Sequence, residues 1–151
     1  MRKLFFPKQI HIIAALVALW CSLISTSGLA QLVVVVNQNA PVTKLNMDEL
    51  RLIFLGRLQL FPGTKVSISV LDQKETSPAF ISFYEKVAKM SALELARYRA
   101  SFLFSGRGRL PEVLDGDANV IEAVQRHQGA IGYVRRESVE GRSVRIIMEV
   151  P

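Results

Sequence analysis

The sequence contains a single cysteine, Cys21, which lies in an apolar stretch near the N-terminus. Residues 31–151 therefore have no thiol for a disulfide, a thiolate metal ligand or a cysteine nucleophile. Histidine is almost as scarce there, because His127 has no second histidine or metal-spaced partner near it. We interpret His127 as a polar residue at the C-terminal end of a helix, where the helix dipole favours imidazole. We expect neither a metal nor a cofactor.

A catalytic pattern is also missing. Asp115 and Asp117 are spaced like a possible acid/base pair, but the sequence offers no nucleophile or desolvating pocket to accompany them. Asp117 is better interpreted as the N-cap of a helix, and Asp115 as part of a turn. We therefore expect a protein that is not an enzyme.

The first thirty residues have the features of a secretory signal peptide. The first eight include three basic residues and no acidic one, and the apolar stretch 12–24 follows. Gly28 and Ala30 provide the small residues of a cleavage site. The alternative is an uncleaved anchor, but 13 apolar residues fall short of the roughly 20 needed to cross a bilayer core. We expect cleavage after Ala30 and an exported domain over residues 31–151.

The exported domain is only mildly basic. Loss of three basic residues with the signal peptide reduces the formal net charge from +6 to +3. Nucleic-acid-binding proteins usually carry a stronger basic excess, and the single Arg107-Gly108-Arg109 segment is too short to count as an RNA-binding motif. We expect no nucleic-acid partner.

Strand and helix patterns alternate along the domain. Residues 32–36 form a β-branched run that is too short for a helix and too apolar for a strand with one solvent-facing side. Asn46 and Ser91 each precede a glutamate by three residues, which is typical of a capping box, and Ser77 is followed by a proline suited to the first helical turn. We predict strands over residues 32–36, 66–71, 130–134 and 144–148, and helices that begin near Asn46, Ser77, Ser91 and Asp117.

This alternation predicts an α/β fold: a three-layer sandwich with helices on both faces of a mixed, mostly parallel sheet. Phe80, Phe83, Tyr84 and Val87 recur at the spacing of one helix face, and we expect that face to be buried.

A possible anion site lies where the second strand ends and the helix at Ser77 begins, because open α/β sheets bind ligands at such ends. The hydroxyls of Thr76 and Ser77, the free N–H groups of the helix start and the ammonium of Lys74 could hold an oxyanion there. The alternative is that Ser77 only caps its helix, as helix ends require with or without a ligand.

Four segments in order, including residues 50–57 and Gly129-Ala130-Ile131-Gly132-Tyr133-Val134, resemble the second lobe of periplasmic phosphate-binding proteins of ABC transporters. The others are residues 33–37 with Pro41, and residues 76–80. The resemblance implies one lobe of a type II periplasmic binding protein fold, a periplasmic location and an oxyanion site at the helix start.

The sequence departs from the family motif Arg-x-Asp-x-Ser-Gly-Thr at this site. Only Asp72 and Thr76 match, while Val70, Lys74 and Glu75 replace the arginine, serine and glycine. Loss of the arginine removes a bidentate phosphate clamp, and a carboxylate beside the site repels anions. Residues 31–151 are also too few for the two lobes that close around ligand in the family.

Two functions follow from these features. The first is recognition of phosphate or a related oxyanion, in transport or sensing, by Lys74, Thr76 and Ser77, with Arg107 and Arg109 as loop cations. The second is an interaction module that binds no small ligand and docks on an envelope membrane protein such as a sensor, transporter or porin.

Overall fold

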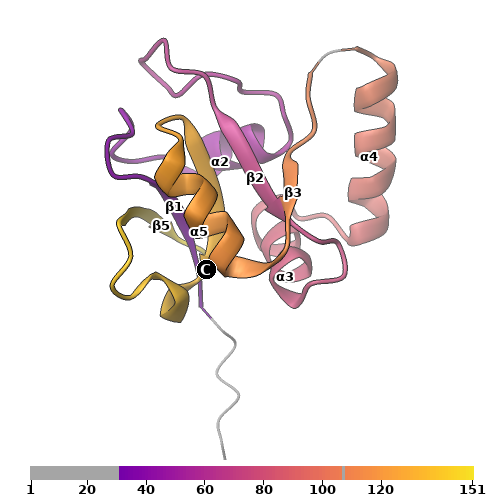
Figure 1. Cartoon of the computed structure of the whole chain (residues 1–151). Helices are drawn as coiled ribbons and strands as arrows, with labels where there is room; N and C mark the ends of the chain where they lie inside the picture. The colour runs from indigo at the N-terminus through magenta and orange to yellow at the C-terminus, as the bar shows by residue number, and fades with distance from the viewer. Residues whose placement is uncertain (1–30, 107) are drawn as a thin grey trace, which may run out of the picture.

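The computed structural model describes residues 31–106 and 108–151. The predicted signal peptide and Arg107 lie outside the described residues. Figure 1 shows a five-stranded sheet between helices. The elements in chain order are β1 (Leu32–Asn37), α2 (Met47–Phe54), β2 (Ser69–Gln73), α3 (Pro78–Val87), α4 (Ala92–Phe104), β3 (Glu112–Leu114), α5 (Gly116–Arg126), β4 (Ala130–Arg135), the short 3-10 helix η2 (Arg136–Val139) and β5 (Val144–Glu149).

The sheet has the strand order β3-β2-β4-β1-β5. Strand β2 pairs in parallel with β3 and β4, whereas β1 pairs antiparallel with β4 and β5. The α/β fold class with a mixed sheet is confirmed, and all four predicted strands lie in this sheet. The three-residue edge strand β3 was not predicted.

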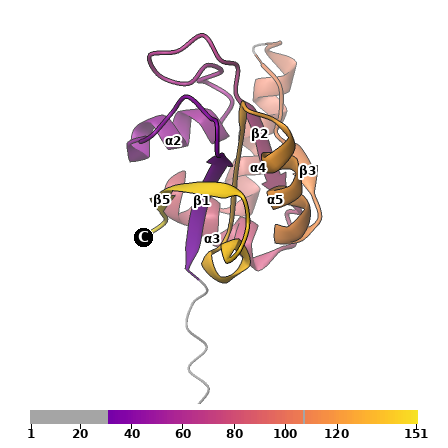
Figure 2. The same ribbon diagram turned by 60° about the vertical axis from the view of Figure 1, so that its left-hand side comes forward.

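Strand β1 is buried on both faces, as its apolar run predicts. Val34 and Val36 belong to the core cluster that includes residues of α2 and α3, while Val33 and Val35 pack with residues of α5 on the other face. All four valines are 0% exposed. Figure 2 shows this layering from the side, with α5 and α2 on opposite sides of the sheet.

All four helices begin within one residue of the predicted starts near Asn46, Ser77, Ser91 and Asp117. Asn46 and Ser91 form complete capping boxes, and the side chain of Ser77 accepts a hydrogen bond from the N–H of Phe80. His127 is exposed and follows α5 directly, at its C-cap.

The prediction that Asp117 caps a helix is wrong. Helix α5 begins at Gly116, with Asp115 at the N-cap position and no side-chain capping bond. The Asp117 carboxylate lies inside the first turn, because donors from Gln73, Arg135 and Ser138 hold it there.

Strand β2 also begins later than predicted. Residues 66–68 bond instead to the preceding segment, where the N–H of Ile68 donates to the carbonyl of Gln59 and that of Phe61 to the carbonyl of Val66. The strand itself runs from Ser69 to Gln73. Its C-terminal end therefore lies directly before the predicted site.

Gly132 explains part of the Gly-Ala-Ile-Gly-Tyr-Val segment. A Cβ atom at this position of β4 would lie 2.6 Å from Cγ1 of Val120 in α5. Glycine thus allows α5 to approach the sheet closely.

Candidate functional site

The C-terminal ends of the three parallel strands meet at one edge of the sheet. Residues 74–77 follow β2, Asp115 follows β3, and Arg135 ends β4. Helices α3 and α5 begin at this edge, which we call the ligand edge. In open α/β sheets such an edge is the usual place for a ligand.

The start of α3 offers fewer N–H donors than most helix starts. Pro78 has no N–H, and the N–H of Phe80 donates to Oγ of Ser77 at 3.0 Å. The N–H of Ile81 donates to the carbonyl of Ser77. Ala79 is thus the first-turn residue whose N–H remains for an anion, and the exposed side chain of Thr76 lies three residues before it in the sequence. Both alternatives for Ser77 remain open, but its capping role is shown.

The two charged residues before Thr76 already face opposite charges. Nζ of Lys74 lies 2.6 Å from Oδ2 of Asp115, and both side chains are more than half exposed. Oε1 of Glu75 lies 3.6 Å from Nη1 of Arg99. An anion at this position would compete with Asp115 for the ammonium group.

Arg109 lies at a different place. It lines a groove of about 1030 Å³ together with Ser67, Ile68 and Ser69, at the N-terminal end of β2. The start of α3 follows the other end of that strand. The structure therefore brings together Lys74, Thr76 and Ser77, but not Arg109.

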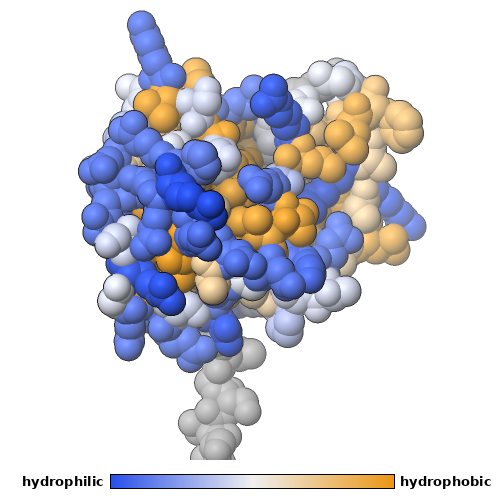
Figure 3. Space-filling view, viewed as in Figure 1, coloured by the Kyte–Doolittle hydropathy of each residue, from blue (hydrophilic) through white to orange (hydrophobic). Residues whose placement is uncertain are grey.

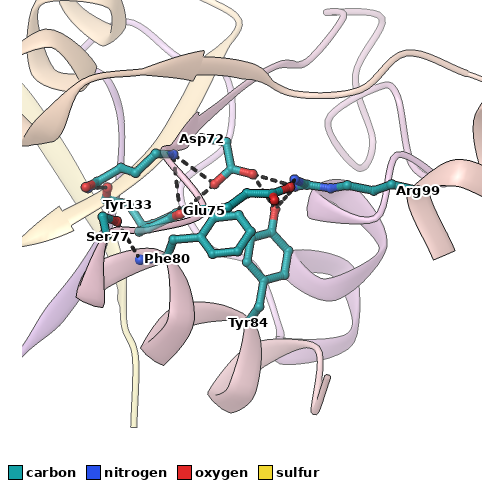
Figure 4. Close-up of polar contacts among 8 residues, drawn as sticks. Asp72, Glu75, Ser77, Phe80, Tyr84, Arg99 and Tyr133 are labelled. Carbon is teal, nitrogen blue, oxygen red and sulfur yellow. Dashed lines mark hydrogen bonds and ion pairs between the residues drawn. The ribbon is translucent and has the colours of Figure 1, made fainter. Parts of the chain in front are cut away.

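A buried polar cluster directly below the ligand edge was missed by the sequence analysis (Figure 4). The carboxylate of Asp72 is 0% exposed and accepts hydrogen bonds from the hydroxyls of Tyr84 at 2.8 Å and Tyr133 at 2.5 Å. Nη2 of Arg99 donates to it at 2.5 Å, and the backbone N–H of Gln73 donates at 2.9 Å. Four donors therefore satisfy this one carboxylate.

The charges within this cluster hold each other in place. Burial, together with the negative charge of Asp72, raises the pKa of Tyr84 and of Tyr133 well above the usual value of 10.0. Both phenols therefore remain donors. Burial lowers the pKa of Arg99, but the neighbouring Tyr84 and Asp72 outweigh it and raise that pKa. The cluster links α4 to β2 and has the character of a structural ion pair.

The cation that neutralises Asp72 comes from a distant part of the chain. Arg99 pairs with it from α4, 27 residues further along. The sequence contained one indication of this burial, because Arg99 lies four residues after Leu95 on the inner face of α4.

A second polar cluster surrounds Asp117 at the same edge. Its carboxylate accepts from Nε2 of Gln73 at 2.8 Å, Nε of Arg135 at 2.7 Å and Oγ of Ser138 at 2.7 Å. Burial raises the pKa of Asp117, but these hydrogen bonds outweigh it and lower the pKa below 3.8.

We predict that Asp117→Asn lowers the free energy of unfolding by about 2 kcal/mol at pH 7, because the amide replaces one acceptor oxygen with an NH₂ group that faces the donors of Gln73 or of Arg135 and Ser138. A folded-state pKa below the unfolded one gives stability that is present above about pH 4 and is lost as the pH falls through the folded value. Urea unfolding should therefore show a difference from wild type that shrinks as the pH falls below about 4.

The matched control is Asp48→Asn, since Asp48 is 83% exposed in its pair with Arg51. We expect it to cost less than about 0.5 kcal/mol. An equal cost for the two variants at pH 7 would contradict the role given to Asp117.

Residues 31–106 and 108–151 contain no group of three or more histidine, cysteine, aspartate or glutamate side chains arranged to hold a metal ion. Within the same ranges, every helix is too short or too polar to span a bilayer.

Comparisons with known proteins indicate the fold. No protein-family model and no curated protein sequence matches the chain. Among solved structures, an ABC-type phosphate transport receptor from Vibrio cholerae matches with a TM-score of 0.62 and 22% identity over 78% of this chain and 45% of that one. A phosphate ABC transporter substrate-binding protein with bound phosphate from Clostridium perfringens gives 0.63 and 22% over 78% and 44%.

PstS from Borrelia burgdorferi gives a TM-score of 0.60 and 18% identity over 78% of this chain and 46% of that one. The chain thus spans less than half the length of these proteins, and its identity to them shows the fold alone. The resemblance drawn from the sequence is confirmed at that level. The described chain has the α/β fold of one lobe of the substrate-binding proteins of phosphate ABC transporters.

Proposed function

We propose that the chain is a non-enzymatic, solute-binding-type module, exported to the periplasm, that recognises phosphate or a related oxyanion at the start of α3. One observation carries the proposal: α3 begins directly after β2 at the ligand edge, in a lobe whose fold is shared by a protein with bound phosphate. Binding of the anion would serve its transport or its sensing.

Only a few donors are available at the start of α3, and they lie within its first turn or directly before it. The exposed hydroxyl of Thr76, the N–H of Ala79 and the positive end of the α3 dipole favour an anion. Lys74 adds a cation that is shared with Asp115. Ser77 contributes by fixing the helix start through its bond to Phe80.

We expect binding to be weak for three reasons. Pro78 lacks a donor, the carboxylate of Glu75 opposes negative charge, and the surface is open because one lobe is present in the described chain. A dissociation constant for phosphate of about 0.1 mM or higher fits such an open site.

The sharpest variant removes the opposing charge. Glu75→Gln should tighten phosphate binding about three- to tenfold, because it removes a negative charge from the residue before Thr76, a charge that its pair with Arg99 only partly screens. Thr76→Val should weaken binding by a similar factor through loss of one hydroxyl donor. Calorimetric titration with phosphate, sulfate and arsenate measures both changes.

Glu85→Gln is the control for net charge, because it removes the same charge about two turns into α3, where Glu85 is exposed. Equal affinities for Glu75→Gln, Glu85→Gln and wild type would place the anion elsewhere. Circular dichroism should show that each variant keeps the fold.

A second candidate is an interaction module that docks on an envelope membrane protein. It is favoured by the pairing of cations at and below the ligand edge: Lys74 faces Asp115, Arg99 faces Asp72, and Arg135 faces Asp117. Such an edge offers little free positive charge to a small anion. A dissociation constant of about 10 mM corresponds to a binding free energy of about 3 kcal/mol. If wild type binds none of the three anions at that concentration, this second candidate replaces the first.

A further inference from the structure

Helix α4 carries an apolar face that is not covered by the described chain. Only Leu95 and Arg99 of its thirteen residues are buried. Leu93, Leu103 and Phe104 are 61%, 52% and 93% exposed. Figure 1 places α4 at the outer margin of the molecule, and Figure 3 shows apolar surface gathered over it.

Four residues form a stripe along this outward face: Leu93, Ala96, Ala100 and Leu103, all exposed. We call them the α4 stripe. Their steps of three, four and three residues keep them on one side of the helix. The order of sizes, large-small-small-large, is the same in both directions along the helix. Its midpoint is Tyr98, which faces inward and donates its hydroxyl to the carbonyl of Leu55.

A stripe that is the same in both directions fits a second copy of itself in antiparallel orientation. About a two-fold axis at position 98, Leu93 faces the partner's Leu103, and Ala96 faces the partner's Ala100. Small residues at the centre allow the helix axes to approach to about 8 Å. Phe104, which extends beyond the stripe, faces the partner's Ala92.

We infer that the chain forms a two-fold symmetric dimer through antiparallel contact of the α4 stripes. A two-fold interface uses the same patch on both copies and therefore requires a self-complementary one. Arg97 of each copy lies close to the axis, and the neighbouring Glu94 on the same helix offsets the repulsion between these two cations. Antiparallel helix dipoles add a favourable term.

The area of the face is small for a stable dimer. Three large side chains and the alanines between them bury on the order of 500 Å² per copy, since an aromatic residue alone buries roughly 150 Å² or more. A standard stable interface buries about 800 Å² per partner. A face smaller than this standard predicts a weak, reversible dimer, and dissociation constants on the order of 10 to 100 µM are the range to test.

Paired charges test both the face and its register. Ala96→Glu/Ala100→Glu places two acidic residues opposite two acidic residues of the partner, and Ala96→Lys/Ala100→Lys does the same with basic ones. Each double variant alone should be monomeric, with at least a tenfold weaker self-association. An equimolar mixture should form a heterodimer, because every contact then joins opposite charges.

Sedimentation equilibrium of protein purified after expression of the full chain measures this association between about 5 and 500 µM, the range around the expected dissociation constant. Ala118→Glu is the control, because Ala118 is exposed on α5 and receives the same substitution; it should dimerise like wild type. A wild-type monomer throughout the range, or acidic and basic variants that dimerise alone as wild type does, would overturn the inference.

The apolar face of α4 could instead bind a lipid surface, and vesicle binding distinguishes the two cases. Binding of monomeric wild type to phosphatidylglycerol vesicles, abolished by Phe104→Ser, would assign the face to lipid and overturn the dimer. Dimerisation with no vesicle binding supports the dimer.

Discussion

Replacement of Arg99 by methionine is expected to lower the free energy of unfolding by about 3–5 kcal/mol, as does removal of one partner from other buried ion pairs. Asp72 is fully buried, and the variant leaves its carboxylate with hydroxyl and amide donors but no cation. Methionine keeps a long apolar side chain and a high helix propensity. The decrease in the free energy of unfolding therefore measures the contribution of the guanidinium group. Urea unfolding followed by circular dichroism at pH 7 measures it.

Arg97→Met is the matched control, because Arg97 is exposed on the same helix two residues earlier. We expect it to change stability by less than about 0.5 kcal/mol. The double variant Asp72→Asn/Arg99→Met should recover part of the loss, because it removes the uncompensated charge as well. An Arg99→Met variant as stable as Arg97→Met would show that the pair is unimportant.

The same cluster gives stability a dependence on alkaline pH. The folded-state pKa values of Tyr84 and Tyr133 are raised by burial and by Asp72. The stabilisation from their protonated hydroxyls is therefore complete below about pH 10, the unfolded value, and is lost as the pH rises above it. The cost of Arg99→Met should accordingly be measured near neutral pH.

Phe83→Ala should cost about 3–5 kcal/mol, the range for truncation of a fully enclosed ring. Phe83 is 0% exposed, stacks on Tyr133 at 3.9 Å between ring centroids, and meets Phe54 edge-on at 4.6 Å. Its removal opens a cavity between α2, α3 and β4, and the surrounding backbone can close such a cavity only in part. Thermal and urea unfolding should agree on the loss.

Ile81→Ala provides the comparison, since Ile81 lies on the same helix and is 40% exposed. We expect it to cost about 1 kcal/mol. A cost for Phe83→Ala below about 1.5 kcal/mol would mean that the core relaxes around the missing ring. The predicted burial of the α3 face is already confirmed, because Phe80, Phe83, Tyr84 and Val87 are all buried.

Features encoded by neighbouring residues could be predicted from the sequence. The apolar run of β1 and the caps at Asn46, Ser77 and Ser91 depend on contacts within a few residues, and the structure confirms them. Strand β3 could not be predicted in this way, because its three residues form a strand only through pairing with β2.

The polar clusters illustrate the same limit. Asp117 looked like a cap because Arg135 and Ser138, which hold its carboxylate, are 18 and 21 residues away. The pairing of Lys74 with Asp115 spans 41 residues and has no local pattern. The sequence could therefore be used to propose an anion site at the start of α3, but it did not reveal the ion pairs that would compete with an anion there.

A phosphate titration monitored by ¹H–¹⁵N NMR tests the central claim most directly. The account predicts fast-exchange shifts concentrated on the backbone N–H groups of Thr76, Ser77 and Ala79, saturating with a dissociation constant of about 0.1 mM or higher. Phosphate at about 10 mM reveals binding with a free energy as small as about 3 kcal/mol. Shifts confined to other parts of the domain, or no shifts at this concentration, would contradict the account.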